Sequence, residues 1–189
     1  MDLNKNQYKM NRVVRQTINE MLFDRGFDTI DTDNVDRIVA SSTANGNRVL
    51  VYFIYDPKVS VKNMKNMREM LDDDPTKYNV LILVYKATIT SFAKQFIATD
   101  VNDLNVQVFS ESELSFNVTK HELVPKHDVL SLEEKAAVVS CYKTGLRYFP
   151  LLLSTDPVAR YYGALPGTMM RITRDSPTAG KYILYRVVV

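Results

Sequence analysis

The chain has 189 residues, a length that fits one domain or two small ones. Lys and Arg number 24, Asp and Glu number 22, and 46% of the residues are apolar, which is ordinary globular composition and excludes a collagen-like or low-complexity chain. The single cysteine, Cys141, excludes a disulfide framework and a multi-cysteine zinc site.

Neither a targeting segment nor a membrane span is expected. The first ten residues contain no apolar h-region of the kind that a signal peptide needs. The longest apolar runs fall far short of the roughly 18 residues that cross a bilayer. The sequence therefore predicts a soluble intracellular protein, in keeping with one unpaired thiol.

The net charge of +2 conceals a difference between two parts of the chain. Through residue 116 there are 14 basic and 16 acidic side chains, and from residue 117 onward there are 10 basic and 6 acidic ones. This difference predicts two parts with different surfaces. It is too mild to indicate a nucleic-acid-binding protein by itself.

The first part shows alternating helix and strand patterns. A helix is predicted over 8–25, with a packed stripe at these positions: Met10, Val13, Val14, Thr17, Ile18, Met21 and Leu22. Buried strands are predicted at 48–55, 79–85 and 105–109. Two more helices are predicted between the strands. The first has apolar residues at Val61, Met64, Met67 and Leu71. The second is capped by Thr90 or Ser91 and carries Phe92, Phe96 and Ile97.

Strands that alternate with helices in this way predict an α/β domain. The strands are almost continuously apolar, so we expect a small, mostly parallel sheet covered on both faces. The helix that follows the first strand should end before Asp72, since negative charge is unfavourable at a helix C-terminus.

The second part predicts a small α+β domain. Ser131 and Glu134 form a capping box that starts a helix ending near Tyr142. Asp156 and Pro157 are an N-cap and a first-turn proline, which indicate a second, short helix. Two strands are predicted at 168–174 and 181–189. The boundary between the parts is placed between residues 118 and 119.

No catalytic constellation is predicted. Cys141 lies inside a predicted helix, where a buried structural thiol is the usual finding. His121 and His127 are six residues apart, which is no helical ligand spacing. The run from Asp72 to Asp74 lacks the alternating ligands and glycine of a calcium loop. We therefore expect no catalytic residue, no metal site and no cofactor.

One alternative is a stand-alone nucleic-acid-binding or nuclease-like α/β protein. Metal-dependent nucleases hold a divalent ion between carboxylates on neighbouring strands. Asp56 follows the first strand, but the second strand, 79–85, carries no acid. Basic residues on one helix face could meet phosphates or be solvated: Lys58, Lys62, Lys65 and Arg68.

Several motifs resemble the fifth subunit of eukaryotic RNA polymerases. In the second part these are HELVPKH at 121–127, DPVARYYG at 156–163 and SPTAGKYILYRVVV at 176–189, and this part is also similar to a small archaeal RNA polymerase subunit that consists of this module alone. In the first part they are DPKVSVKNMK at 56–65 and LILVYKATITSFAKQ at 81–95. The resemblance covers nearly the whole chain and is weakest between residues 26 and 48.

The resemblance implies a jaw domain at 1–118 and an assembly domain at 119–189. A member of this family is a non-catalytic structural subunit that docks on the largest polymerase subunit, beside neighbouring subunits, as a monomer within the complex. Its jaw lies near downstream duplex DNA, which it contacts weakly and without reading sequence. The implied location is the nucleus; the altered motifs leave open a virus-encoded polymerase in a virion or a cytoplasmic viral factory.

Two sets of site residues follow. The resemblance and the residue chemistry together predict DNA contact through Pro57, Lys58, Lys62, Thr90 and Ser91. The family's Thr-Pro-Ser-Ala loop has become Thr-Ser-Phe-Ala at 90–93. An excess of Arg and Tyr together with the motif residues predicts a partner-binding surface at Asp156, Pro157, Arg160, Tyr161, Arg171, Arg174, Thr178, Gly180, Tyr182 and Arg186.

Overall fold

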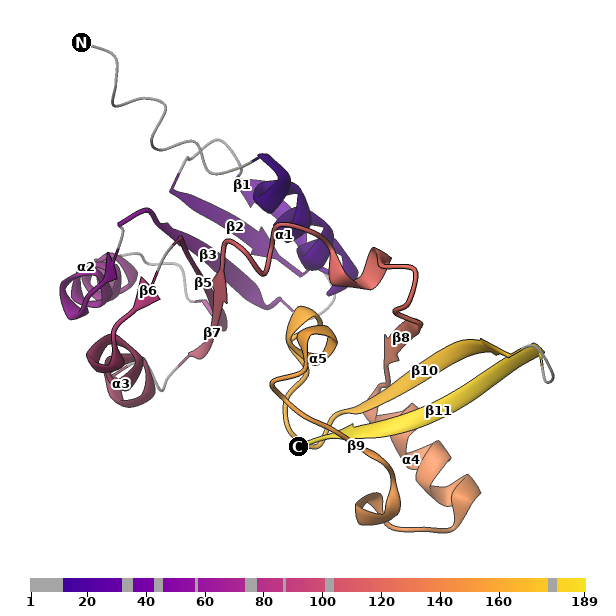
Figure 1. Cartoon of the computed structure of the whole chain (residues 1–189). Helices are drawn as coiled ribbons and strands as arrows, with labels where there is room; N and C mark the ends of the chain where they lie inside the picture. Colours follow the sequence, from indigo (N-terminus) through magenta and orange to yellow (C-terminus); the bar gives the residue numbers. More distant parts are fainter. Residues whose placement is uncertain are drawn as a thin grey trace. The chain divides into compact units, whose positions relative to one another are not determined.

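The computed structural model describes residues 12–31, 36–42, 46–56, 58–73, 78–86, 88–100, 104–176 and 180–189. The chain forms two compact units, Met1–Phe116 and Asn117–Val189, coloured indigo to magenta and orange to yellow in Figure 1. The division lies after Phe116, two residues before the predicted boundary. Within the described residues, no helix has both the length and the apolarity needed to cross a membrane.

The N-terminal unit contains a five-stranded sheet. Its strands lie in the order β1 (Asp28–Asp31), β2 (Arg37–Ser41), β3 (Arg48–Ile54), β5 (Val80–Tyr85) and β7 (Asn105–Ser110). The pairs β3–β5 and β5–β7 are parallel, as predicted, but β1–β2 and β2–β3 are antiparallel. The sheet is therefore mixed, because two short strands that the sequence did not reveal extend it beyond β3.

Helices cover both faces of this sheet, which confirms that prediction (Figure 1). One face packs against α1 (Arg12–Asp24), which buries Val14, Ile18, Met21 and Leu22. The other packs against α2 (Val61–Asp73) and α3 (Ser91–Asp100), where Met64, Met67 and Ala93 are fully buried. Successive side chains of a strand point to opposite faces, so two apolar faces require the nearly continuous apolar run seen in β3 and β5.

Three details differ from the sequence prediction. Val13 is 44% exposed because the buried stripe of α1 begins at Val14. Phe92 is 75% exposed, since its neighbour Ala93 occupies the inward position at the start of α3. The backbone of α2 continues through Asp73, so Asp72 lies inside the helix and not beyond it. Met10 and Asp74 lie outside the described residues.

A second, two-stranded sheet in the N-terminal unit joins two loops. β4 (Lys58–Val59) leads into α2, and β6 (Thr88–Ile89) leads into α3. The strands pair in parallel, with Lys58 opposite Thr88. This pairing fixes the starts of α2 and α3 side by side, although the two loops are about thirty residues apart in the chain.

The C-terminal unit is a four-stranded sheet with helices on both faces. The strand order is β8 (Lys126–Val129), β10 (Met169–Ser176), β11 (Gly180–Val188) and β9 (Leu151–Leu152). The pairs β8–β10 and β10–β11 are antiparallel, while β9 runs parallel to the end of β11. The helices are α4 (Leu132–Tyr142) and α5 (Pro157–Tyr161), with 3-10 turns at Val118–Lys120 and Leu146–Tyr148.

Both predicted helix starts are confirmed. The Ser131 hydroxyl accepts from the Glu134 backbone N–H, and the Glu134 carboxylate accepts from the Ser131 N–H, so α4 begins with a complete capping box. Asp156 caps α5, which carries Pro157 in its first turn. Cys141, however, is exposed and not buried. α4 contacts the core through its half-buried Val138 and Val139 and through Tyr142, whose ring meets that of buried Phe149 edge to face.

Candidate functional site

The two faces of the C-terminal sheet carry different candidate residues. Paired residues of an antiparallel ladder share a face, and successive residues alternate between faces. The α5 face, which packs against α5 through Met170 and Val188, carries Met170, Ile172 and Arg174 of β10 with Tyr182, Leu184 and Arg186 of β11. The α4 face, which packs against α4, carries Met169, Arg171 and Thr173 with Ile183, Tyr185 and Val187.

The α5 face presents cationic and aromatic side chains to solvent. Arg174 is exposed, and Tyr182, its partner across the ladder, is 52% exposed. Arg186 is half-buried and donates from Nη1 to the Leu151 carbonyl over 3.2 Å. Among the described residues, neither arginine has a carboxylate partner. This face therefore offers two positive charges and an aromatic ring to an external group.

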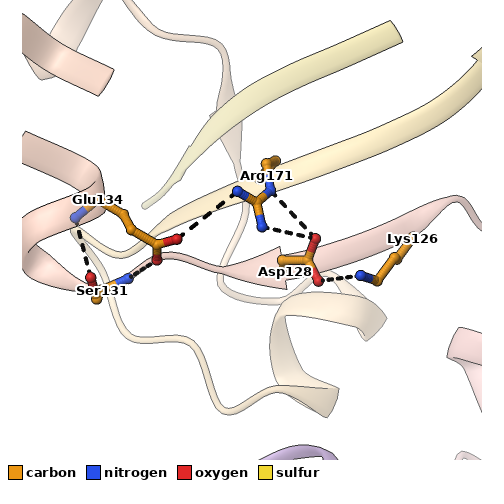
Figure 2. A network of polar contacts seen from close by, with 5 residues as sticks. All are labelled: Lys126, Asp128, Ser131, Glu134 and Arg171. Carbon is orange, nitrogen blue, oxygen red and sulfur yellow. Dashed lines mark hydrogen bonds and ion pairs between the residues drawn. The ribbon is translucent and has the colours of Figure 1, made fainter. Parts of the chain in front are cut away.

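Arg171 belongs to the α4 face and is engaged within the unit (Figure 2). Its guanidinium lies 3.4 Å from Asp128 and 4.0 Å from Glu134, the residue that also completes the capping box. Lys126 reaches Asp128 over 3.0 Å. The structure does not bring Arg171 and Arg174 onto one face, because the period of two along β10 places them on opposite faces.

Tyr161 does not lie on a surface. Its side chain is 3% exposed, and its hydroxyl accepts a hydrogen bond of 3.0 Å from Nδ2 of Asn117. Its ring meets that of Tyr162 edge to face, with 5.3 Å between the centroids. Tyr161 therefore helps to fix α5 against the turn at Val118–Lys120, and the structure does not place it on the surface predicted for partner binding.

The remaining candidates of the C-terminal unit are a cap and several surface positions. Asp156 accepts from the Val158 N–H over 2.8 Å, so its carboxylate is used within the helix start. Pro157 is exposed and Arg160 is half-buried, both on α5. Gly180 is exposed, with φ of 72°, and begins β11. Thr178 lies outside the described residues.

The predicted DNA-contact loops do come together in the N-terminal unit. Lys58 is exposed on β4, and Lys62 is exposed in the first turn of α2. Ser91 is exposed at the start of α3, which lies beside α2 through the β4–β6 pair. Pro57 lies outside the described residues. The fold thus places two lysines and one hydroxyl near two adjacent helix starts.

Thr90 has a different role from the one predicted. Its hydroxyl donates to the Val59 carbonyl over 3.0 Å and accepts from the Ala93 N–H over 3.2 Å. The one hydroxyl proton is thus used to join the two loops. Thr90 therefore positions α3 and has no proton left to donate to a phosphate, whereas the exposed Ser91 keeps that capacity.

The sequence did not reveal a polar cavity in the N-terminal unit. It has a volume of about 410 Å³ and is lined by Asp36, Tyr52, Phe53, Ile54, Tyr55, Asp56, Asn63 and Asn66. Burial, followed by the charges of Asp36 and Asp56, raises the pKa of Tyr52 above its ordinary value. Asp36 lies twenty residues before Asp56, and the hydrogen bond from the Phe53 N–H to the Asp36 carbonyl brings the two together.

The cavity bears on the nuclease-like alternative, for which the sequence showed no second carboxylate near Asp56. Asp56 does have a second carboxylate nearby, but Asp36 comes from the start of the antiparallel strand β2 and not from the parallel strand β5. The Asp56 carboxylate accepts a hydrogen bond from Asn63. Within the described ranges, no group of three or more His, Cys, Asp or Glu side chains could hold a metal ion.

Comparisons with known proteins agree across the chain. Residues 116–188 match the family model "RNA polymerase Rpb5, C-terminal domain". The subunit rpabc1 of DNA-directed RNA polymerases I, II and III from Dictyostelium discoideum is 34% identical over 93% of this chain and 95% of its own length. Subunit RPABC1 from Caenorhabditis elegans is 32% identical over 93% of this chain and 94% of its own.

A third relative, RPABC1 of Caenorhabditis briggsae, is 36% identical over 80% of this chain and 71% of its own length. The chain therefore belongs to the Rpb5 family, the fifth-subunit family of eukaryotic DNA-directed RNA polymerases. Its members are structural polymerase subunits without an active site of their own, and the similarity does not favour the nuclease-like alternative.

Proposed function

We propose that this chain docks on the largest subunit of a multisubunit DNA-directed RNA polymerase and contributes no catalytic group. The C-terminal unit would be the assembly domain and the N-terminal unit the jaw. The observation that carries this proposal is the match along both units to polymerase subunits of nearly the same length.

The α5 face is the part of the C-terminal unit best suited to docking. Arg174 and Tyr182 lie opposite each other and exposed, and Arg and Tyr are the residue types enriched at interface hot spots. Arg186 extends this patch along the same face toward β9, where it donates to the Leu151 carbonyl, and Arg160 of α5 is half-buried. By contrast, Arg171 already has two carboxylate neighbours, so a partner would gain little from it.

The N-terminal unit would contact downstream duplex DNA through the loops joined by β4 and β6. Lys58 and Lys62 can meet phosphates, and Ser91 can donate from its hydroxyl. Phosphate contacts carry no base information, so the jaw would steady the duplex without reading its sequence. Two exposed lysines give a shallow, salt-sensitive attraction, so contact would depend on the assembled enzyme.

Membership of the family supports a location in the nucleus, where eukaryotic RNA polymerases work. A virus-encoded polymerase, with a virion or a cytoplasmic factory as its site, is the alternative. Within the polymerase the chain would act as a monomer beside neighbouring subunits, without a cofactor.

Affinity purification tests this function. The tagged full chain should bring down the largest polymerase subunit from its own cells, in a yield that survives nuclease treatment. Purified polymerase that lacks the tagged chain, or tagged chain recovered without any polymerase subunit, would overturn the proposal.

A further inference from the structure

The outer edge of β11 is open along most of its length. β11 runs over nine residues, Gly180–Val188, and pairs with β10 from Gly180 to Val187 without any shift of register. On its other side it pairs with β9 only at Val187 and Val188. Among the described residues, no strand covers β11 between Gly180 and Arg186 (Figure 1).

The hydrogen bonds at the end of β11 show which backbone groups face this edge. The Val187 N–H donates to Pro150 beside β9, whereas the Val188 N–H donates to Thr168 on the β10 side. The direction of the backbone N–H and C=O groups alternates from one residue of a strand to the next. The odd-numbered residues of β11 therefore direct these groups away from β10, toward the open edge. Lys181, Ile183 and Tyr185 therefore present a regular row of donors and acceptors to the open edge.

Such an edge is a template for another strand. Soluble proteins usually protect edges by shortness, proline, a bulge or several charges, because an unprotected edge pairs with other chains. The described part of β11 has no bulge, and Lys181 is the single charged residue whose backbone faces outward. Ile183 on one side of the strand is 47% exposed, and Tyr182 on the other is 52% exposed.

We propose that the open edge of β11, from Gly180 to Arg186, receives an extended segment of the largest polymerase subunit as a fifth strand of the sheet. This rests on the proposed function and specifies how the C-terminal unit docks. Main-chain hydrogen bonds supply affinity in this mode of recognition, and the alternating side chains supply specificity.

The charges of the α5 face define the chemistry of the added segment. Arg174 and Arg186 lie on this face without a carboxylate partner among the described residues, and Tyr182 and Leu184 lie beside them. The added segment thus carries an acidic side chain toward the α5 face. Toward the α4 face it meets Lys181, Ile183 and Tyr185, so it carries apolar side chains there.

Two variants at one position separate backbone pairing from side-chain contact. Ile183→Pro removes the backbone N–H that faces the open edge, and an edge strand can accommodate proline at such a position. Ile183→Ala keeps that N–H and removes most of the side chain. In the full chain, Ile183→Pro should lower co-purification of the largest subunit about tenfold, and Ile183→Ala should lower it less than about twofold. Equal retention by the two variants would overturn the proposal.

Hydrogen exchange tests the same proposal on wild-type protein, so no substitution can affect the result by disturbing the fold. The amides of Ile183 and Tyr185 should become protected when free protein is assembled into polymerase, whereas those of Tyr182 and Leu184, which face β10, should be protected in both states. Assembly without new protection at Ile183 and Tyr185 would refute strand addition while leaving docking intact. Failure of wild-type protein to assemble would instead refute the proposed function.

A photo-crosslinker at position 182 identifies the added segment directly. The crosslinked peptide should come from the largest polymerase subunit and contain Asp or Glu with alternating apolar residues. A peptide without an acidic residue would contradict the assigned chemistry.

Discussion

The two faces of the C-terminal sheet carry similar residues but engage them differently. On the α4 face, Arg171 meets Asp128 and Glu134, so its charge serves the unit itself. On the α5 face, Arg174 and Arg186 have no such carboxylate among the described residues. The number of arginines in a unit therefore does not locate an interface. An interface is better located by asking which arginines already have a carboxylate partner within the fold.

The largest expected effect is on stability, at the buried tyrosine. Tyr161→Ala removes a ring that is 3% exposed and the hydrogen bond that Nδ2 of Asn117 donates to its hydroxyl, so the free energy of unfolding should fall by about 3 kcal/mol. Tyr161→Phe keeps the ring and should cost about 1 kcal/mol. Thermal or urea unfolding of the purified chain measures both, and a Tyr161→Ala variant as stable as wild type would show that the ring is not core.

The exposed tyrosine should behave in the opposite way. Tyr182→Ala combined with Arg174→Ala should leave the free energy of unfolding within about 0.5 kcal/mol of wild type, because both side chains are exposed. The same variant should lower co-purification of the largest subunit about tenfold, as expected for hot-spot residues. A variant that docks normally would remove the α5 face from the interface.

Arg171 provides the matched comparison for the α5 face. Arg171→Ala should cost about 0.5 kcal/mol of stability, since its ion pairs are partly exposed, and should leave docking unchanged. Urea unfolding and co-purification are the two measurements. Loss of docking without loss of stability would show that the α4 face is the contact surface.

The smallest effect is expected in the N-terminal unit. Lys58→Glu with Lys62→Glu should lower crosslinking from downstream DNA to this subunit in assembled polymerase by about two- to fivefold, because each exposed contact is weak. Lys65→Glu, at an exposed position one turn further along α2, is the matched control and should change crosslinking less. If the double variant and the Lys65→Glu control lower crosslinking equally, the loops joined by β4 and β6 do not approach DNA.

Much of the fold follows from periodicity and caps in the sequence. The apolar runs gave β3, β5 and β7, and the capping box gave the start of α4. β1 and β2 were not predicted, because they are short, and only their pairing with β3 supports them as strands. β4 and β6 have two residues each and exist through their mutual pairing.

The candidate site was predictable only in part. The alternation along β10 already separates Arg171 from Arg174, so their opposite faces could have been inferred from the sequence. The burial of Tyr161 could not, because it depends on Asn117, 44 residues away. The cavity at Asp36 and Asp56 was also hidden, since it depends on the register between β2 and β3.

Site-specific crosslinking in assembled polymerase tests whether the chain docks through the α5 face. One photo-crosslinker replaces Tyr182 on the α5 face, and another replaces Lys126, an exposed position on β8 that lies on the α4 face opposite Thr173. Docking through the α5 face predicts a crosslink to the largest subunit from position 182 and little from position 126. Equal crosslinking from both positions, or none from position 182, would contradict docking through the α5 face.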